Sequence, residues 1–256
     1  MRSVLLILCG GLIAVGALLG VRATLPSQLA VAAPAAAMTG DKAALGKVIR
    51  EYLIANPEVL VEAMQELERK QDSQRDTVAQ KAVQENHAQL VSDPESPIAG
   101  NPDGDVTIVE FSDYQCPYCK RAHSAVKAVL ASDSKVKLVF KDLPILGEPS
   151  RIAALAALAA RAQHKHLAFH NALMEFNGKL DRDKIMQIAG SVGLDVAQLQ
   201  KDMDDPKLKE IIDRNMALAS ALGVRGTPAF VVGNQFVPGA VDADTLKQLI
   251  ADARKG

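Results

Sequence analysis

The sequence predicts a mixed α/β fold, in which a small sheet carries a long helical insertion and follows an N-terminal helical extension. Three observations predict this fold class. A β-branched run at residues 106–111 leads directly into a segment with helical spacing of apolar residues. Two more short apolar runs, at 229–232 and 235–237, follow about a hundred residues later. Helical periodicity dominates the residues between these runs and also residues 39–91.

Composition sets the frame for these elements. The chain has 256 residues, of which 48% are hydrophobic and 23% charged, so it is long enough for one substantial core and a smaller appendage. The formal net charge of -1 gives no reason to expect nucleic acid as a partner. Aromatic residues make up only 4% and tryptophan is absent, which does not favour a function based on stacking sugars or bases.

The N-terminus predicts export. A single positive residue, Arg2, precedes the uncharged stretch 4–21, and an alanine-rich tract follows. This order is typical of a secretory signal peptide, which we place at residues 1–37. The small-residue cleavage candidates follow Ala23, Ala33 and Ala37. The stretch also reaches the lower length limit of a spanning helix, so an uncleaved membrane anchor is the alternative. Either interpretation exports the rest of the chain, and we expect a periplasmic location.

Residues 38–91 predict a helical extension with a short and a long helix. Asn56 is the expected cap of the second helix and Pro57 its first residue. Each helix has an apolar stripe, formed by Leu45, Val48, Ile49, Tyr52 and Leu53 in the first and by Val59, Leu60, Ala63, Met64 and Leu67 in the second. Two helices alone cannot bury both stripes. They could pack on the rest of the chain, but we expect homo-oligomerisation through residues 41–91, because exposed stripes of this size usually bind a partner.

A turn-rich linker at 92–105 is expected to precede the catalytic domain at 106–256. Its first strand and helix are followed by a second strand in "VKLVFKDLP" and by four or five helices within an insertion at about 149–222. Gly233 and Asn234 separate the last two apolar runs and predict a hairpin. A C-terminal amphipathic helix should close the chain, with Asp242 as its N-cap.

Only two of the three cysteines remain once the signal is set aside, because Cys9 lies inside its apolar run. Cys116 and Cys119 would be exported to a compartment where disulfides persist. A structural staple over so short a loop contributes only about 2 kcal/mol. A zinc site needs four ligands where this pair offers two, and His166 and His170 are interpreted as a solvated pair on a helix face, so no metal is expected.

The surroundings of the cysteines predict redox chemistry instead. A strand, a short loop and a helix place Cys116 at a helix N-terminus, where the free N–H groups and the helix dipole favour the thiolate. Thiolate is the species that attacks a disulfide sulfur. Cys119, one turn further, should be more buried and should resolve the mixed disulfide. Pro117 suits the first helical turn because its missing N–H costs nothing there.

Two motifs together resemble a known family. "FSDYQCPYCKRA" followed by "GVRGTPAFVVGNQFVPGA" is similar to the exported DsbA-like thiol:disulfide interchange proteins of the thioredoxin superfamily. The resemblance covers residues 100–254 and implies a thioredoxin fold with a helical insertion. It implies that Cys116 attacks and Cys119 resolves, and that Pro228 is a cis-proline facing the disulfide. It also implies that the backbone around Thr227 pairs with an extended substrate segment.

Other site residues follow less directly from the sequence. Glu110 lies in the first strand, where the resemblance implies a buried acid that handles protons as the thiols titrate. The alternative interpretation is that the strand is partly exposed and the Glu110 side chain faces outward. Lys141, at the end of the next strand, is a possible partner for Glu110, with a surface lysine as the more common case. The resemblance gives His123 no role, and it is interpreted as a surface residue. Pro117 and Tyr118, between the cysteines, are expected to influence the reduction potential.

The functional hypothesis is a periplasmic thiol:disulfide oxidoreductase with isomerase or reductase character. Within the resemblance, threonine before the cis-proline and an oligomerising extension like that of the ScsC group both favour isomerisation. One alternative is a monomeric dithiol oxidase, and another is an exported copper- or zinc-handling protein. No cofactor is expected beyond the Cys116–Cys119 disulfide. The expected partners are unfolded or misoxidised exported proteins and a membrane redox partner that resets the cysteine pair.

Overall fold

A computed structural model describes residues 42–255 of the chain. The expected signal peptide at 1–37, its cleavage candidates and Cys9 lie outside the described residues. The chain divides into two units, one ending at Leu60 and the other beginning at Val61.

The first unit contains helix α1 (Lys42–Ala55), which buries none of its residues. Leu45, Val48, Ile49 and Tyr52 recur at helical spacing and are each about half exposed or more. The side chain of Asn56 donates to the Tyr52 carbonyl at 2.9 Å, so it closes this helix rather than capping the next one. The apolar stripe predicted for the first helix is therefore present and open to solvent in the single chain.

Helix α2 (Glu58–Glu85) begins at the end of the first unit and continues in the second. Its last turns bury Ala79, Ala82 and Val83, and the short helix α3 (His87–Val91) buries Leu90. These side chains join a cluster formed with strands of the sheet. The expectation that all of residues 38–91 lies outside the catalytic domain is thus wrong at its C-terminal end, because an apolar face resumes there.

A five-stranded sheet forms the centre of the second unit. Its strands are β1 (Ile98–Gly100), β2 (Val106–Ser112), β3 (Val136–Asp142), β4 (Ala229–Val232) and β5 (Gln235–Pro238). They lie in the order β1-β3-β2-β4-β5, with β2 parallel to β3 and the other pairs antiparallel. Strand β1 lies within the expected linker at 92–105, which therefore forms an edge of the sheet. A three-residue strand beside Pro97 has too little alternation to be visible in the sequence.

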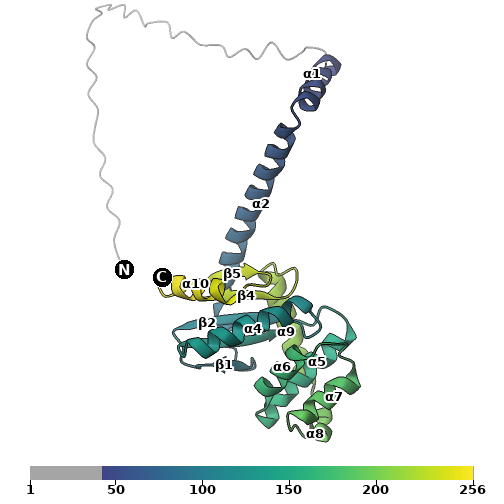
Figure 1. The fold of residues 1–256 in the computed structure, drawn as a ribbon, viewed down its shortest axis with the longest axis vertical. Helices are drawn as coiled ribbons and strands as arrows, with labels where there is room; N and C mark the ends of the chain where they lie inside the picture. Colours follow the sequence, from purple (N-terminus) through teal and green to yellow (C-terminus); the bar gives the residue numbers. More distant parts are fainter. Residues whose placement is uncertain (1–41, 256) are drawn as a thin grey trace, which may run out of the picture. The chain divides into compact units, whose positions relative to one another are not determined.

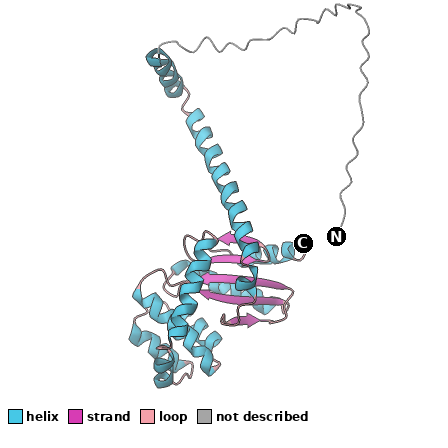
Figure 2. Cartoon of the chain, turned by 180° about the vertical axis from the view of Figure 1, so that it is seen from behind, coloured by secondary structure: helices cyan, strands magenta, loops and turns pink. Residues whose placement is uncertain are grey.

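Helices cover both faces of this sheet (Figure 2). Helix α4 (Pro117–Ser132) and helix α10 (Ala243–Ala253) lie side by side on one face (Figure 1). Asp242 caps α10 by accepting a hydrogen bond from the Thr245 backbone N–H. The opposite face packs against α3, the end of α2 and helix α9 (Pro206–Ala221). Because α4 follows β2 after a short loop and leads to β3, the start of α4 lies at the end of strand β2 in the centre of the sheet.

The helical insertion lies between β3 and β4. It comprises α5 (Glu148–Ala159), a 3-10 turn (Ala160–Gln163), α6 (His166–Glu175), α7 (Arg182–Ser191), α8 (Val196–Asp202) and α9. The alanine-rich α5 is its central helix and buries Ala153, Ala156 and Ala157 completely, which permits neighbouring helices to approach closely. The predicted fold class, a thioredoxin-type sheet with an inserted helical domain after an N-terminal helical region, is confirmed.

Candidate active site

The two cysteines lie where β2 passes into α4. Cys116 is the N-cap residue of α4 and Pro117 is the first residue of the helix. The Cys116 N–H donates to the Asp113 carbonyl at 3.0 Å, which closes a tight turn before the helix. Both thiols are unbonded in this structure and both are buried, with Cys116 5% and Cys119 0% exposed. The order strand, turn, helix follows from the apolar run ending at Phe111 and from the proline at the helix start.

The Thr227 and Pro228 segment lies directly against Cys116. The peptide bond between Thr227 and Pro228 is cis. The Cys116 Sγ donates to the Thr227 carbonyl oxygen at 3.2 Å, across 111 residues of sequence. The two motifs that were quoted from distant parts of the sequence therefore meet in one place.

Cys119 has a different environment from Cys116. Burial raises the pKa of the Cys119 thiol well above its usual range. The backbone N–H of Asp113 donates to the Cys119 Sγ at 3.5 Å, which partly opposes this effect. Cys119 is thus a protonated thiol that needs an acceptor for its proton before it can act as a nucleophile.

Asp113 organises the loop around the thiols and was missed by the sequence analysis. One carboxylate oxygen accepts from the Gln115 N–H at 2.8 Å and the Ser150 hydroxyl at 2.7 Å. The other accepts from the backbone N–H groups of Ile145 and Leu146 at 2.9 and 3.0 Å. An aspartate three residues before the first cysteine, in a loop whose backbone groups need acceptors, is the signal that could have identified it.

Apolar side chains are exposed next to this loop. Tyr118, between the cysteines, is 57% exposed, and Ile145 and Leu146 are 41% and 50% exposed. The Arg121 guanidinium lies over the Tyr118 ring at 4.3 Å from its centroid. Ile145 and Leu146 belong to this neighbourhood because Asp113 holds their backbone. The thiols are therefore bordered by an apolar surface that an unfolded polypeptide could contact.

Glu110 is buried in β2, and its side chain is 1% exposed. Burial, together with the nearby Asp142 carboxyl, raises the pKa of Glu110 to about 8. Asp142, at the end of β3, is equally buried, and burial raises its pKa to about 7. The alternative of an outward-facing Glu110 is therefore wrong. The structure places Glu110 and Asp142 on the same face of the sheet, since Glu110 pairs with Phe140 in the register of β2 and β3.

Lys141 is not the partner of Glu110. Side chains alternate along a strand, so Lys141 faces the opposite side of the sheet from its neighbours Phe140 and Asp142. Its ammonium group donates to Asp93 at 2.8 Å, and its side chain is 1% exposed, so it is not a surface lysine either. Burial lowers the pKa of Lys141, whereas the Asp93 carboxylate raises it.

Three histidines that were expected to be solvent-exposed are buried. His123, on α4, is 5% exposed rather than at the surface, and His166 and His170, on α6, are 7% and 1% exposed rather than solvated. The Phe140 ring contacts the rings of His166 and His170. The ring centroids of His123 and His166 lie 5.4 and 5.8 Å from that of His170. The Tyr114 hydroxyl and the His170 Nδ1 form a hydrogen bond of 3.0 Å. Burial lowers the pKa of all three imidazoles, that of His166 to about 3.

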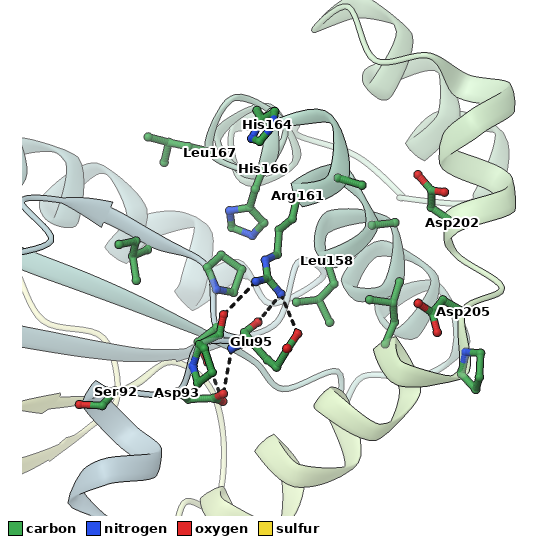
Figure 3. A pocket seen from close by; sticks show the side chains of 18 of the residues that line it. Ser92, Asp93, Glu95, Leu158, Arg161, His164, His166, Leu167, Asp202 and Asp205 are labelled. Carbon is green, nitrogen blue, oxygen red and sulfur yellow. Dashed lines mark hydrogen bonds and ion pairs between the residues drawn. The ribbon is translucent and has the colours of Figure 1, made fainter.

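A cavity of about 1250 Å³ lies away from the thiols (Figure 3). The segment before β1, the 3-10 turn and the start of α9 line it, and neither cysteine does. Arg161 crosses its wall and donates to the carbonyl oxygens of Pro94 and Glu95 (Figure 3). The chemistry of the cysteines is thus not located in this cavity.

Neither a metal site nor a membrane-spanning helix is found within residues 42–255. No group of three or more His, Cys, Asp or Glu side chains in this range is arranged to hold a metal ion. None of the helices in the same range has the length and apolar character that crossing a bilayer requires.

Comparison with known families gives two matches. The DSBA-like thioredoxin domain matches residues 107–251. The copper resistance protein ScsC N-terminal domain matches residues 41–74, which include α1 and the first half of α2.

Solved structures agree with these matches. A thioredoxin-like oxidoreductase from Silicibacter pomeroyi is 50% identical, with a TM-score of 0.66 over 67% of this chain and 99% of that one. A linker-deletion mutant of ScsC from Proteus mirabilis is 30% identical, with a TM-score of 0.65 over 87% of this chain and 99% of that one.

Longer proteins also share this region. The Na(+)/H(+) antiporter NhaA of Herminiimonas arsenicoxydans is 31% identical over 168 residues, which are 64% of this chain and 27% of the antiporter. The chain spans about a quarter of the length of the first curated relatives that it matches.

Proposed function

We propose that this chain, which belongs to the DsbA-like family of thiol:disulfide oxidoreductases, exchanges disulfides with other proteins through Cys116 and Cys119. The observation that carries the proposal is the position of Cys116, at the N-terminus of α4 and 3.2 Å from the Thr227 carbonyl before the cis-proline. The helix N-terminus stabilises a thiolate, and the adjacent peptide groups of Thr227 are available to pair with an extended substrate.

The exchange takes two steps. The Cys116 thiolate attacks one sulfur of a substrate disulfide, so that a Cys116–substrate disulfide forms and the other substrate sulfur leaves as a thiolate. Cys119 then loses its proton and attacks the Cys116 sulfur, which releases the second substrate thiolate. The enzyme dithiol is oxidised to a disulfide while the substrate disulfide is reduced to two thiols. The same steps in reverse insert a disulfide into a reduced protein.

We further propose isomerase or reductase character rather than simple oxidation. In an isomerase, the Cys116 mixed disulfide is attacked by a different thiol of the substrate before Cys119 can resolve it. The full burial of Cys119 and the protonation of its thiol favour this outcome by slowing resolution. The substrates would be misoxidised or unfolded exported proteins, recognised by the apolar surface of Tyr118, Ile145 and Leu146. The N-terminal sequence, in which Arg2 precedes the apolar stretch 4–21, supports action in the periplasm. A membrane redox partner would return the two cysteines to their starting oxidation state there.

Reactivation of scrambled ribonuclease distinguishes disulfide isomerisation from simple oxidation of thiols. The exported chain, kept reduced by a glutathione buffer, is expected to restore ribonuclease activity from protein with randomly paired disulfides. The monomeric oxidase alternative predicts instead a rapid oxidation of reduced ribonuclease without recovery of the scrambled protein. The Cys119→Ser variant is an informative companion, since an isomerase that needs only Cys116 retains part of its activity and an oxidase loses all of it.

The exposed stripe of α1 supports self-association. Because Leu45, Val48, Ile49 and Tyr52 lie on one side of a helix that buries nothing in the single chain, we propose that copies of the chain associate through them. The match of residues 41–74 to the ScsC N-terminal domain supports this region as a distinct module. An oligomer would place several thiol pairs around one substrate, which suits rearrangement of disulfides.

Ile49→Glu is expected to convert the oligomer to a single chain, because a carboxylate in the contact would lose its hydration without a partner. Light scattering of the exported protein measures the mass. Arg50→Glu, which adds a carboxylate to the more polar side of α1, is the control and should leave the mass of the oligomer unchanged. A wild-type protein with the mass of one chain, or an Ile49→Glu oligomer of undiminished mass, contradicts self-association through α1.

A further inference from the structure

A line of polar side chains runs through the interior from the sheet to the surface of α6. Its members come from β2, β3, the active-site loop, α4 and α6, and are Glu110, Asp142, Tyr114, His170, His123 and Glu175. Buried polar groups are costly to keep without partners, so a continuous line of them in one core indicates a role beyond packing.

The inner end of the line is the pair of carboxyl groups. Glu110 and Asp142 lie on the same face of the sheet and interact electrostatically. One oxygen of Glu110 and both of Asp142 have no hydrogen-bond partner of normal geometry. The Asp142 carboxyl is nevertheless close enough to the Tyr114 hydroxyl for each to influence the titration of the other. Two neighbouring buried carboxyls readily share and exchange protons.

The middle of the line is the hydrogen bond between Tyr114 and His170. Tyr114 lies two residues before Cys116 and packs in the same buried cluster as both cysteines. Its backbone neighbour Asp113 donates to the Cys119 Sγ. A phenol and an imidazole each have one donor and one acceptor site, so each can take a proton on one side and release another on the opposite side.

The outer end reaches solvent through His123. A cavity of about 150 Å³ is lined by both His123 and His170, and it is large enough to admit water beside the two rings. The His123 Nε2 has no hydrogen-bond partner and lies 3.8 Å from the Glu175 Oε1. The Glu175 side chain is 54% exposed. The line therefore connects the buried carboxyls with a carboxylate at the surface.

We propose that Tyr114 and His170 relay the proton of the Cys119 thiol between the buried Glu110–Asp142 pair and solvent at His123 and Glu175. The inference rests on the proposed exchange reaction. When Cys119 attacks the mixed disulfide, its S–H bond breaks, the carboxyl pair accepts the proton, and the Cys116–Cys119 bond forms as the substrate thiolate leaves. Asp142 then protonates the Tyr114 oxygen while the Tyr114 hydroxyl proton passes to His170 Nδ1. The His170 Nε2 then releases its proton toward solvent, which leaves His170 as the tautomer protonated on Nδ1, and proton exchange with water restores the starting tautomer before the next cycle.

Tyr114→Phe tests the relay because it keeps the ring and removes only the hydroxyl. Two rates are measured on the same protein with a disulfide-bonded peptide: formation of the mixed disulfide by Cys116 and its resolution by Cys119. The ratio of the second rate to the first is expected to fall by about ten-fold or more, as for the loss of a proton-transfer group. The solvent deuterium isotope effect on the second rate should rise, since proton transfer becomes limiting. His87→Asn, at an exposed histidine of α3 that is not part of this line, is the control and should change neither the ratio of rates nor the isotope effect.

His170→Asn separates proton transfer from packing. An asparagine retains a polar partner for the Tyr114 hydroxyl but cannot pass a proton on, so the relay predicts the same loss as in Tyr114→Phe. A normal resolution rate in either variant, with an unchanged isotope effect, overturns the relay while the exchange reaction stands. A wild-type protein that forms no mixed disulfide overturns the proposed function instead, so the two failures are distinguishable.

Discussion

Replacing Cys116 with serine is expected to abolish disulfide exchange, with a loss of about three orders of magnitude or more in turnover. The serine hydroxyl has nearly the size of the thiol and can still donate to the Thr227 carbonyl, so the fold should persist. It cannot form the covalent intermediate with a substrate sulfur. Reduction of insulin by a thiol reductant, followed by turbidity, measures the loss.

The control for this variant is its unfolding curve. Cys116→Ser and wild type, both reduced, should unfold at closely similar urea concentrations, because the substitution leaves the burial of the site unchanged. Turnover within ten-fold of wild type in a folded Cys116→Ser protein would exclude Cys116 as the attacking group and leave Cys119 as the candidate thiol within residues 42–255.

Glu110→Gln is expected to stabilise the reduced protein at pH 7 by about 3 kcal/mol. The folded chain holds the Glu110 proton up to a pKa of about 8, whereas the ordinary glutamate pKa of 4.5 applies to the unfolded chain. The folded state therefore binds more protons between these values, and its free energy of unfolding falls as the pH rises through this window. Glutamine has no proton to lose, so it removes this dependence.

Urea unfolding at several pH values measures the effect. The difference between Glu110→Gln and wild type should vanish below about pH 4.5, where glutamate is protonated in both states, grow as the pH rises, and level off above about pH 8. The exposed Glu210→Gln variant is the control and should follow wild type at every pH. A Glu110→Gln protein that is less stable than wild type at pH 8 would show that the carboxylate is charged and satisfied in the folded state.

The elements with strong sequence periodicity could be predicted, as could the meeting of the two motifs. The β-branched run before Cys116 and the apolar pair around Gly233 specify strands whatever their neighbours are. The strand β1 and the partner of Glu110 could not be predicted in this way. The partner depends on the register of β2 against β3, which places Phe140 opposite Glu110 and turns Lys141 to the far face.

The buried histidines were misassigned although the sequence contains a signal for them. His123 continues the helical spacing of Cys119, Ala122 and Val126, and His166 and His170 flank Phe169 and Leu173 on one face of α6. Because histidine was treated as a polar residue, the three histidines were not counted with the apolar faces of α4 and α6. That His170 meets Tyr114 could not be predicted at all, because the two residues are 56 positions apart and α4, β3, α5 and the 3-10 turn lie between them, so only the packing of the insertion joins them.

Trapping of a substrate by Cys119→Ser tests the central claim most directly. Without its resolving thiol, the protein should accumulate a covalent adduct with a disulfide-bonded peptide, and mass spectrometry should locate the adduct on Cys116 and show its release by reductant. An absence of any adduct, or an adduct that persists in the double variant with Cys116→Ser, would contradict exchange through this cysteine.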